Sequence, residues 1–280
     1  IEVIRSMGLD CALVRNRAEL MLLPAGVTKA SGLVAALADL GLSPHNTVAV
    51  GDAENDHSLF DACEVGVAVA NAVPSLRAHA DLVLEGQGGA GVVELLESGL
   101  LAGRTVLHPS RWSITLGTDR AGAPVSLPAS QINVLIAGGS GTGKSYVAGL
   151  MAEGLIRLGY AVVVIDPEGD HRGLLDLPLV WVAEGGQGPW LPLDVGRLLQ
   201  ADHSVVVDLA PLTVEERAEQ LRRLPAEIQA HRARSGRPQW VVVDEAHSSF
   251  GAGGAGQRAF EPSAKGNLLV TWRPTELAAD

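Results

Sequence analysis

The sequence has 280 residues, of which 47% are hydrophobic and 19% charged, and its formal net charge at neutral pH is −11. This composition is typical of packed globular chains and excludes disordered, collagen-like and coiled-coil classes. The length accommodates two domains, and no uninterrupted apolar segment is long enough to predict a membrane span.

The chain has only two cysteines, Cys11 and Cys63, and neither belongs to a cluster with metal-ligand spacing. The sequence therefore predicts neither a disulfide framework nor a zinc site, and it favours a reducing, cytoplasmic setting. Because the chain starts at Ile1 and stops at Asp280 soon after an apolar run, we expect that both ends are cut from a longer protein.

The front part of the chain alternates short apolar strands with helical segments. We expect strands over 47–50 and 65–70, and helices over 32–40, 54–62 and 75–80. This alternation predicts an α/β domain with a mostly parallel sheet that helices cover on both faces.

Helical periodicity then disappears, and two β-prone segments, Trp112–Leu116 and Pro124–Leu127, flank a turn rich in glycine and polar residues. This pattern predicts a β-hairpin. We accordingly expect a front domain over 1–100, a linker and hairpin over 101–128, and a second domain over 129–280.

The rear part again alternates strands and helices. The expected strands are 132–137, 161–166, 179–182, 204–209, 239–244 and 267–271. One helix follows the first strand, and Thr213 begins another before the fifth. Pro225 allows a further helix to start there, which Ser235 and Gly236 end. The sequence predicts a second α/β domain.

The strongest motif lies between the first rear strand and its helix, where the sequence satisfies the phosphate-binding (Walker A) pattern G-x-x-x-x-G-K-[ST]. Its eight residues are Gly138, Gly139, Ser140, Gly141, Thr142, Gly143, Lys144 and Ser145. The glycines let backbone N–H groups surround a polyphosphate, Lys144 supplies charge to the β and γ phosphates, and the Ser145 hydroxyl can bind Mg²⁺. The motif predicts an ATP site with Mg²⁺, and an ordinary glycine-rich loop is the alternative.

A second motif follows the buried strand that begins at Trp240 and runs into two carboxylates, Asp244 and Glu245. In a parallel sheet this end faces the ligand crevice. Asp244 would hold Mg²⁺, usually through water, and Glu245 would polarise the water that attacks the γ-phosphate. The alternative is a solvated acidic turn. Ala246 and His247 complete the letters of a "DEAH" box, which we discount because the other motifs of those helicases are absent.

Three strand-end segments, 163–170, 205–210 and 268–274, together with the leading hairpin, resemble the HerA/FtsK class of P-loop ATPases and specifically its HerA-like branch. The resemblance covers about 104–280. It implies ATP hydrolysis and a homo-oligomeric ring, with a polar residue near the last strand end sensing the γ-phosphate. The family's frequent Gln is replaced by Trp272 here, so Thr271 or Arg273 would supply that role. A surface cation is the alternative for Arg273.

In the front part, three segments resemble the C-terminal half of a Cof-type (HAD-IIB) haloacid dehalogenase-like phosphatase, with residues 1–22 as a cap remnant. The segments are 24–32, 48–56 and 65–72. The resemblance implies that Lys29 offsets charge on the nucleophilic aspartate and the phosphoryl group, that Asp52 binds Mg²⁺, and that Asn55 and Asp56 position phosphate and support the metal site. A structural turn is the alternative for the segment around Asp52.

One departure from that family bears on activity. Its nucleophile lies in a D-x-D motif at the start of the domain, and no such motif precedes Lys29. Because covalent phosphoryl transfer needs the attacking carboxylate, we expect no phosphatase turnover from these residues. A small phosphorylated metabolite is the expected substrate of a longer chain that carries the nucleophile.

The sequence thus predicts a HerA-like ATPase fused behind a HAD phosphatase domain. The alternative is a nucleotide-responsive module that regulates the phosphatase without motor activity. Residues 217–237 contain six arginines and two glutamates. This segment predicts either a contact with the phosphate backbone of nucleic acid or a helix whose charged face is solvated.

Overall fold

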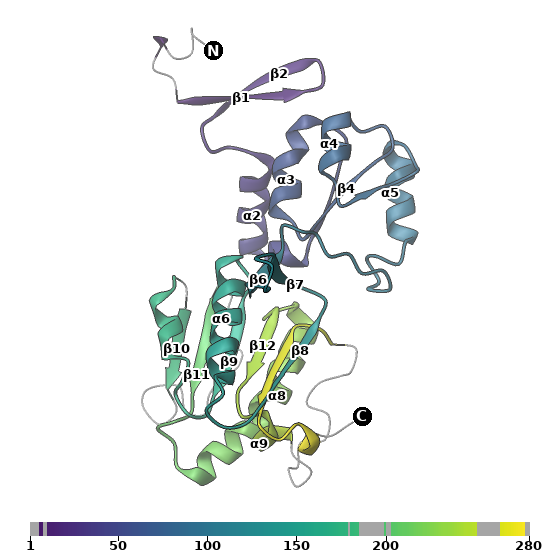
Figure 1. Cartoon of the computed structure of the whole chain (residues 1–280). Coiled ribbons are helices and arrows are strands. Elements are labelled where there is room, and N and C mark those ends of the chain that lie inside the picture. The colour runs from purple at the N-terminus through teal and green to yellow at the C-terminus, as the bar shows by residue number, and fades with distance from the viewer. Residues whose placement is uncertain are drawn as a thin grey trace. The chain divides into compact units, whose positions relative to one another are not determined.

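The computed structural model describes residues 6–7, 10–178, 180–184, 199, 203–250 and 264–277 (Figure 1). The chain divides into two compact units, Ile1–Pro109 and Ser110–Asp280. The division lies inside the predicted linker. Both units are α/β, and both contain a parallel sheet.

The front unit begins with an antiparallel hairpin and continues with alternating helices and strands. Its elements are β1 (Cys11–Asn16), β2 (Glu19–Pro24), α2 (Lys29–Asp39), η1 (Pro44–Asn46), β3 (Val48–Gly51), η2 (Glu54–Asp56), α3 (His57–Ala62), β4 (Val65–Ala68), α4 (Pro74–His79), β5 (Leu82–Val83) and α5 (Gly88–Glu97). Strands β3, β4 and β5 form a parallel sheet in that order.

The strands and helices predicted for the front domain are confirmed within a few residues, except that the expected helix over 54–62 is split into η2 and α3. Sequence reasoning missed the first hairpin, β5 and α5. β5 has only two residues, and α5 starts with two glycines, so neither gives a clear periodic signal. Strand β4 is buried along its whole length, and Phe60 and Leu76 are fully buried in the same core cluster.

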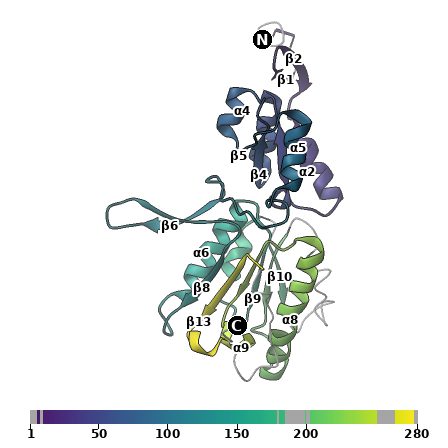
Figure 2. The same cartoon turned by 90° about the vertical axis from the view of Figure 1, so that its right-hand side faces the viewer.

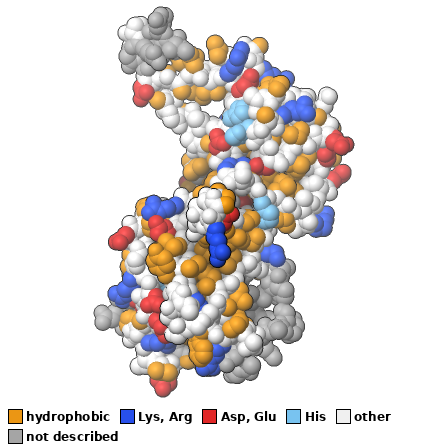
Figure 3. Space-filling view, viewed as in Figure 1, with side chains coloured by type: hydrophobic (Ala, Val, Ile, Leu, Met, Phe, Trp, Pro, Cys, Tyr) orange, Lys and Arg blue, Asp and Glu red, His pale blue; other side chains and the backbone are white. Residues whose placement is uncertain are grey.

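The β1–β2 hairpin keeps an apolar face at the surface. Leu13 and Leu22 are directly paired across the two strands, and together with Leu20 they are 42%, 50% and 70% exposed, respectively. Figure 3 shows apolar side chains at the surface of this hairpin. The hairpin therefore contributes little to the core of the front unit as the structure describes it.

The rear unit opens with a second hairpin, which extends from the rest of the unit as a two-stranded ribbon (Figure 2). Its elements are β6 (Ser113–Thr118), β7 (Pro124–Pro128), β8 (Asn133–Ala137), α6 (Lys144–Arg157), β9 (Val162–Asp166), η3 (Arg172–Asp176), β10 (Val180–Glu184), β11 (Ser204–Asp208), α8 (Val214–Ser235), β12 (Trp240–Val243), α9 (Ala246–Phe250), β13 (Asn267–Thr271) and η4 (Pro274–Glu276). All six predicted strands are present, although Leu179 lies outside the described residues.

Six parallel strands form the rear sheet in the order β10-β11-β9-β12-β13-β8. Side chains alternate between its two faces, as the period of a strand requires. Along β9, Val162 and Val164 pack in the cluster that includes α6, whereas Val163 and Ile165 pack in the cluster that includes α8 and α9. The sheet is thus covered on both faces, which explains why its strands are almost uniformly apolar.

The predicted break at Pro225 is wrong, because α8 is one helix of 22 residues with Pro225 inside it. A proline in a helix interior removes one hydrogen bond and crowds the preceding turn. Here Leu221, Leu224 and Ile228 are buried in the core cluster beneath the sheet, and this packing keeps the helix continuous.

Within the part of the chain that the structure describes, no helix combines the length and apolar character that spanning a bilayer requires.

Candidate functional sites

The phosphate-binding loop connects β8 to α6 and carries the backbone geometry that its glycines predict. Gly141 and Gly143 have φ angles of 72° and 87°, in the left-handed region that side chains with a Cβ rarely adopt. Lys144 is the first residue of α6 and is only 9% exposed, and its Nζ donates a hydrogen bond to the Gly139 carbonyl at 3.0 Å. The loop therefore places a cation and a helix N-terminus at the carboxyl edge of the sheet.

The second predicted motif reaches the same edge from a different strand. Strand β12 ends at Val243, and β13 separates it from β8. The next residue, Asp244, is 3% exposed and is hydrogen-bonded to Ser145 and His171. Burial by itself would raise the pKa of Asp244, but the hydrogen bonds from His171, the Glu245 backbone and Ser145 hold that pKa below its usual range. The fold thus brings together Ser145 and Asp244, the two predicted ligands of Mg²⁺.

Glu245 follows directly and has a φ angle of 47°, a backbone conformation that is strained for a residue with a side chain. Its backbone N–H donates to Asp244 Oδ1 at 2.8 Å. Partial burial raises the pKa of Glu245, and the nearby charges of Asp244, Glu168 and Asp170 add to this rise against the opposing charge of Lys144. A raised pKa makes the ionised carboxylate a stronger proton acceptor than an ordinary glutamate.

His247, from the discounted "DEAH" letters, links Glu245 to the last strand. Its Nδ1 lies 3.3 Å from Glu245 Oε2 and 3.3 Å from Thr271 Oγ1, and its ring packs edge-on against Trp272. Thr271 is fully buried and accepts a hydrogen bond from the Arg273 backbone N–H at 3.0 Å. Thr271 therefore lies at the end of β13 in contact with the Glu245 network.

The guanidinium carbon of Arg273 lies 3.8 Å from the centre of the Trp272 ring. This is a cation–π distance. Trp272 stands where the resembled family frequently has Gln. In this chain its ring therefore stacks against the guanidinium of Arg273.

Sequence reasoning missed His171, which lies in the segment after β9. Its Nε2 forms a hydrogen bond with Asp244 Oδ2 at 2.9 Å. Burial opposes protonation of His171, but the hydrogen bond to Asp244 and the charges of Asp166, Asp244 and Asp170 raise its pKa overall. The signal that could have revealed His171 is its place five residues after Asp166, the acidic end of a predicted strand. Sequence reasoning used that strand end for the family resemblance and derived no site residue from it.

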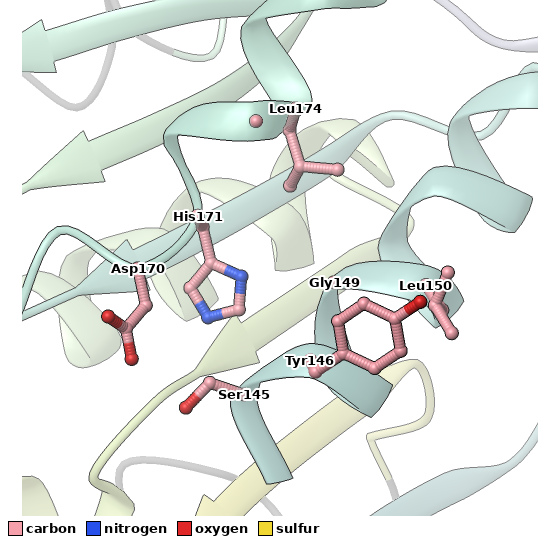
Figure 4. A pocket seen from close by; sticks show the side chains of 8 residues that line it. Ser145, Tyr146, Gly149, Leu150, Asp170, His171 and Leu174 are labelled. Carbon is pink, nitrogen blue, oxygen red and sulfur yellow. The ribbon is translucent and has the colours of Figure 1, made fainter. Parts of the chain in front are cut away.

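A cavity of about 320 Å³ lies between the first turns of α6 and the segment after β9 (Figure 4). Ser145 and Tyr146 line it from α6, and Asp170, His171 and Leu174 line it from the other side. The cavity therefore adjoins both the predicted Mg²⁺ ligand Ser145 and the residue that contacts Asp244.

In the front unit, Lys29 and Asp56 come together at the carboxyl end of β3. Lys29 Nζ forms an ion pair with Asp56 Oδ1, while Asp56 Oδ2 accepts hydrogen bonds from the backbone N–H groups of Asp52 and Ala53 at 2.9 and 3.2 Å. A Cβ at Gly51 would lie 2.6 Å from Asp56 Cβ, so this close approach requires glycine. Burial opposes ionisation of Asp56, but Lys29 and the two backbone donors lower its pKa overall.

Asp52 faces a different cation. Its carboxylate pairs with the Arg17 guanidinium from the turn of the first hairpin, and the Arg17 backbone N–H donates to Glu54 Oε2 at 2.7 Å. The Oδ1 atom of Asn55 is buried without a hydrogen-bond partner. Among the described residues, no group of three or more His, Cys, Asp or Glu side chains has an arrangement that could hold a metal ion. The predicted front residues thus cluster, with Asp52 and Asp56 each paired to a cation of the chain.

Comparison with known families finds one match in each unit. Residues 14–96 match the family described as haloacid dehalogenase-like hydrolase, and residues 114–246 match the family described as helicase HerA, central domain. The chain joins a HAD-like segment to a HerA-like segment. Both resemblances predicted from the sequence are confirmed.

The HAD-like segment is similar to curated phosphoglycolate phosphatases. Phosphoglycolate phosphatase 2 of Saccharolobus solfataricus is 43% identical over 82 residues, which are 29% of this chain and 35% of the relative. Phosphoglycolate phosphatase of Methanoculleus marisnigri is 38% identical over 95 residues, which are 34% of this chain and 41% of the relative. The chain therefore spans between about a third and two fifths of the length of these two relatives.

A solved structure of the cytoplasmic domain of the Thermomonospora curvata type VII secretion ATPase EccC covers 60% of this chain and 22% of its own. Its sequence identity is 17% and the TM-score is 0.29.

Proposed function

We propose that the HerA-like segment binds ATP with Mg²⁺ and hydrolyses it. The observation that carries this proposal is the hydrogen bond between Ser145, the neighbour of Lys144, and Asp244, which comes from a strand that is not adjacent in the sheet. Lys144 and Ser145 follow β8, Asp244 follows β12, and β13 lies between those strands. Only the folded sheet creates this arrangement, at the edge where parallel α/β sheets bind their ligands.

The chemistry of these residues fits the proposed ligands. Backbone N–H groups of residues 138–143 and the Lys144 ammonium are donors for phosphate oxygens, and the hydroxyl of Ser145 and the carboxylate of Asp244 offer the oxygen ligands that Mg²⁺ prefers. Bound Mg²⁺ would neutralise charge on the phosphate oxygens. Glu245 would accept a proton from the attacking water, and Thr271 would sense the terminal phosphate from the end of β13.

The test is isothermal titration calorimetry with ATP in the presence of Mg²⁺, comparing wild type, Lys144→Ala and Lys265→Ala. Lys265 provides a matched control because it is an exposed lysine of the same unit. Loss of a charged hydrogen-bond donor predicts a fall in affinity of roughly 10- to 150-fold for Lys144→Ala. Equal affinities for wild type and Lys144→Ala would contradict the assignment, and binding without any hydrolysis in the full-length assembled protein would favour the nucleotide-responsive module.

For the HAD-like segment, we propose that it forms the Mg²⁺-binding half of a phosphatase for a small phosphorylated metabolite, completed by a nucleophilic aspartate elsewhere in a longer chain. The Lys29–Asp56 pair and the position of Asp52 at the end of β3 support this proposal. The similarity to phosphoglycolate phosphatases supports the substrate class.

The proposal includes a cytoplasmic location and a homo-oligomeric ring built on the HerA-like segment. Two free cysteines, Cys11 and Cys63, are compatible with a reducing compartment. Sedimentation velocity of the full-length protein with and without ATP tests the ring, and a monomer under both conditions would contradict it.

A further inference from the structure

The segment that follows β9, residues 168–172, is tied to the ends of three neighbouring strands. Strands β11, β9 and β12 are adjacent in the sheet, and each ends in or just before a buried aspartate: Asp208, Asp166 and Asp244. Asp208 and Asp166 are direct register partners, and Asp244 follows Val243, which is paired with Ile165. The three carboxylates therefore lie in one row across the edge of the sheet.

Each aspartate holds a different part of the 168–172 segment. Asp166 accepts hydrogen bonds from the backbone N–H groups of residues 168, 169, 170 and 171, at 2.8–3.2 Å. Asp208 pairs with the Arg172 guanidinium through two nitrogens, at 2.7 and 2.6 Å. Asp244 contacts the His171 ring at 2.9 Å. The segment is thus fixed on both sides of His171.

The His171–Asp244 contact is shielded from water. Their side chains are 1% and 4% exposed, so water does not compete for this hydrogen bond. The other oxygen of the carboxylate, Oδ1, accepts the Glu245 backbone N–H at 2.8 Å. The orientation of the Asp244 carboxylate is therefore set from two sides, by His171 at Oδ2 and by the turn into Glu245 at Oδ1.

We propose that His171 is a positioning residue, which donates a hydrogen bond from its Nε2–H group to Asp244 and so holds that carboxylate toward Ser145 for Mg²⁺ binding. The inference rests on the proposed Mg²⁺–ATP site and deepens it. A donor behind a metal-binding carboxylate restricts its rotation, and loss of such a partner typically lowers metal affinity by about 10- to 100-fold. Figure 4 shows His171 and Ser145 on opposite sides of the same cavity, with His171 supplied by the segment after β9.

The experiment measures ATP affinity by calorimetry, once with Mg²⁺ and once with a chelator, for wild type, His171→Ala and His171→Gln. The matched control is His45→Gln, which removes a comparably buried histidine–carboxylate pair, His45–Glu64, from the front unit. The affinity gained by adding Mg²⁺ should fall by about 10-fold or more in His171→Ala, while the affinity in chelator and the His45→Gln values stay at wild-type level.

The glutamine variant separates positioning from simple support of the fold. The side-chain amide nitrogen of Gln reaches about the position of histidine Nε2, so His171→Gln should recover much of the Mg²⁺-dependent gain. A full Mg²⁺-dependent gain in His171→Ala would overturn the proposal, as would a glutamine variant that folds normally but behaves like alanine.

A measurement on wild type covers the case in which His171→Ala does not fold. Long-range ¹H–¹⁵N spectra of the histidine rings should show a protonated Nε2 for His171, and adding Mg²⁺ with ADP should shift the His171 signals but not those of His45. An Nε2 without a proton would overturn the proposal. Absence of ATP binding in wild type would instead overturn the proposed function, so the two failures are distinguishable.

Discussion

The two candidate sites both lie at the carboxyl end of a parallel strand, but their carboxylates have different kinds of partner. In the HAD-like segment, Asp56 and Asp52 are each paired with a cation of the chain, Lys29 and Arg17. In the HerA-like segment, Asp244 is held by a hydroxyl, a backbone N–H and a histidine, while Lys144 donates to the Gly139 carbonyl of the phosphate-binding loop.

The kind of partner determines how much of a carboxylate's charge is left for a metal ion. Cations that pair with carboxylates neutralise the charge that would otherwise attract a metal ion. Hydrogen-bond donors that leave the charge in place orient a carboxylate for a ligand. The carboxylate of Asp244 is therefore oriented mainly by hydrogen bonds, whereas Asp52 and Asp56 are each paired with a cation of the chain.

Replacing Glu245 should have the largest effect. Glu245→Gln removes the group that would accept the proton from water, so we expect ATP hydrolysis in the assembled protein to fall by about 10²- to 10⁴-fold with ATP affinity unchanged. A coupled phosphate-release assay measures the rate, and calorimetry measures binding. Unchanged turnover would remove Glu245 from the catalytic role.

Replacing Asp56 should destabilise only the front unit. Asp56→Asn breaks the ion pair of a buried carboxylate with the half-exposed Lys29 and weakens two backbone hydrogen bonds, at a cost of about 1.5–3 kcal/mol at neutral pH. Because every tryptophan of the chain lies in the rear unit, urea unfolding followed by tryptophan fluorescence should be unchanged, while circular dichroism should show an earlier transition. Coincident shifts in both signals would contradict this localisation.

The same variant tests the sign of the pKa shift. Since folding lowers the pKa of Asp56, its charged form stabilises the protein above the ordinary aspartate pKa of about 4, and this stabilisation disappears as the pH falls through the lower folded pKa. The difference in stability between wild type and Asp56→Asn should therefore shrink between about pH 5 and pH 2. A difference that grows on acidification would contradict the shift.

Reversing surface charge on α8 tests the nucleic-acid alternative. Arg223 pairs with Glu227, and Arg232 donates to the carbonyls of Gln239 and Lys265. Arg222 and Arg234 are exposed, and Arg222 pairs with Glu219 one turn away on the same helix. If DNA stimulates hydrolysis in the full-length protein, we expect a weaker salt dependence after both Arg222 and Arg234 are replaced by Glu. The slope of the logarithm of the apparent DNA affinity against the logarithm of salt concentration should become shallower by about one for each lost phosphate contact.

Arg157→Glu, on the exposed side of α6, provides the matched charge reversal for that experiment. An ATPase rate that is indifferent to DNA at low salt would favour the nucleotide-responsive module.

The smallest effect concerns Asp52. Because no nucleophilic aspartate is identified beside Lys29 and Asp52, the 280-residue chain and its Asp52→Asn variant should show the same background rate toward an aryl phosphate across Mg²⁺ concentrations. Robust turnover that Asp52→Asn abolishes would show that a nucleophile exists within the chain, and would make the alignment with the HAD family wrong.

The order of strands and helices followed largely from the sequence. Apolar strands ending in Asp or Gly, and the spacing of Gly143, Lys144 and Ser145, are local signals that depend on neighbouring residues alone. The continuous α8 did not follow, because the penalty of Pro225 is local whereas the packing of Leu224 and Ile228 against the sheet is not.

By itself the sequence determined the two family resemblances, the phosphate-binding loop and the candidate roles of Asp244 and Glu245. Only the tertiary structure decided which side chains meet. The order of the parallel strands places β12 two positions from β8, so Ser145 reaches Asp244, and it aligns the ends of β9, β11 and β12, so His171 reaches Asp244 as well. Residues distant in the chain become neighbours because hydrogen-bonded register and two-sided burial fix strand order, and no local pattern in the sequence encodes that order.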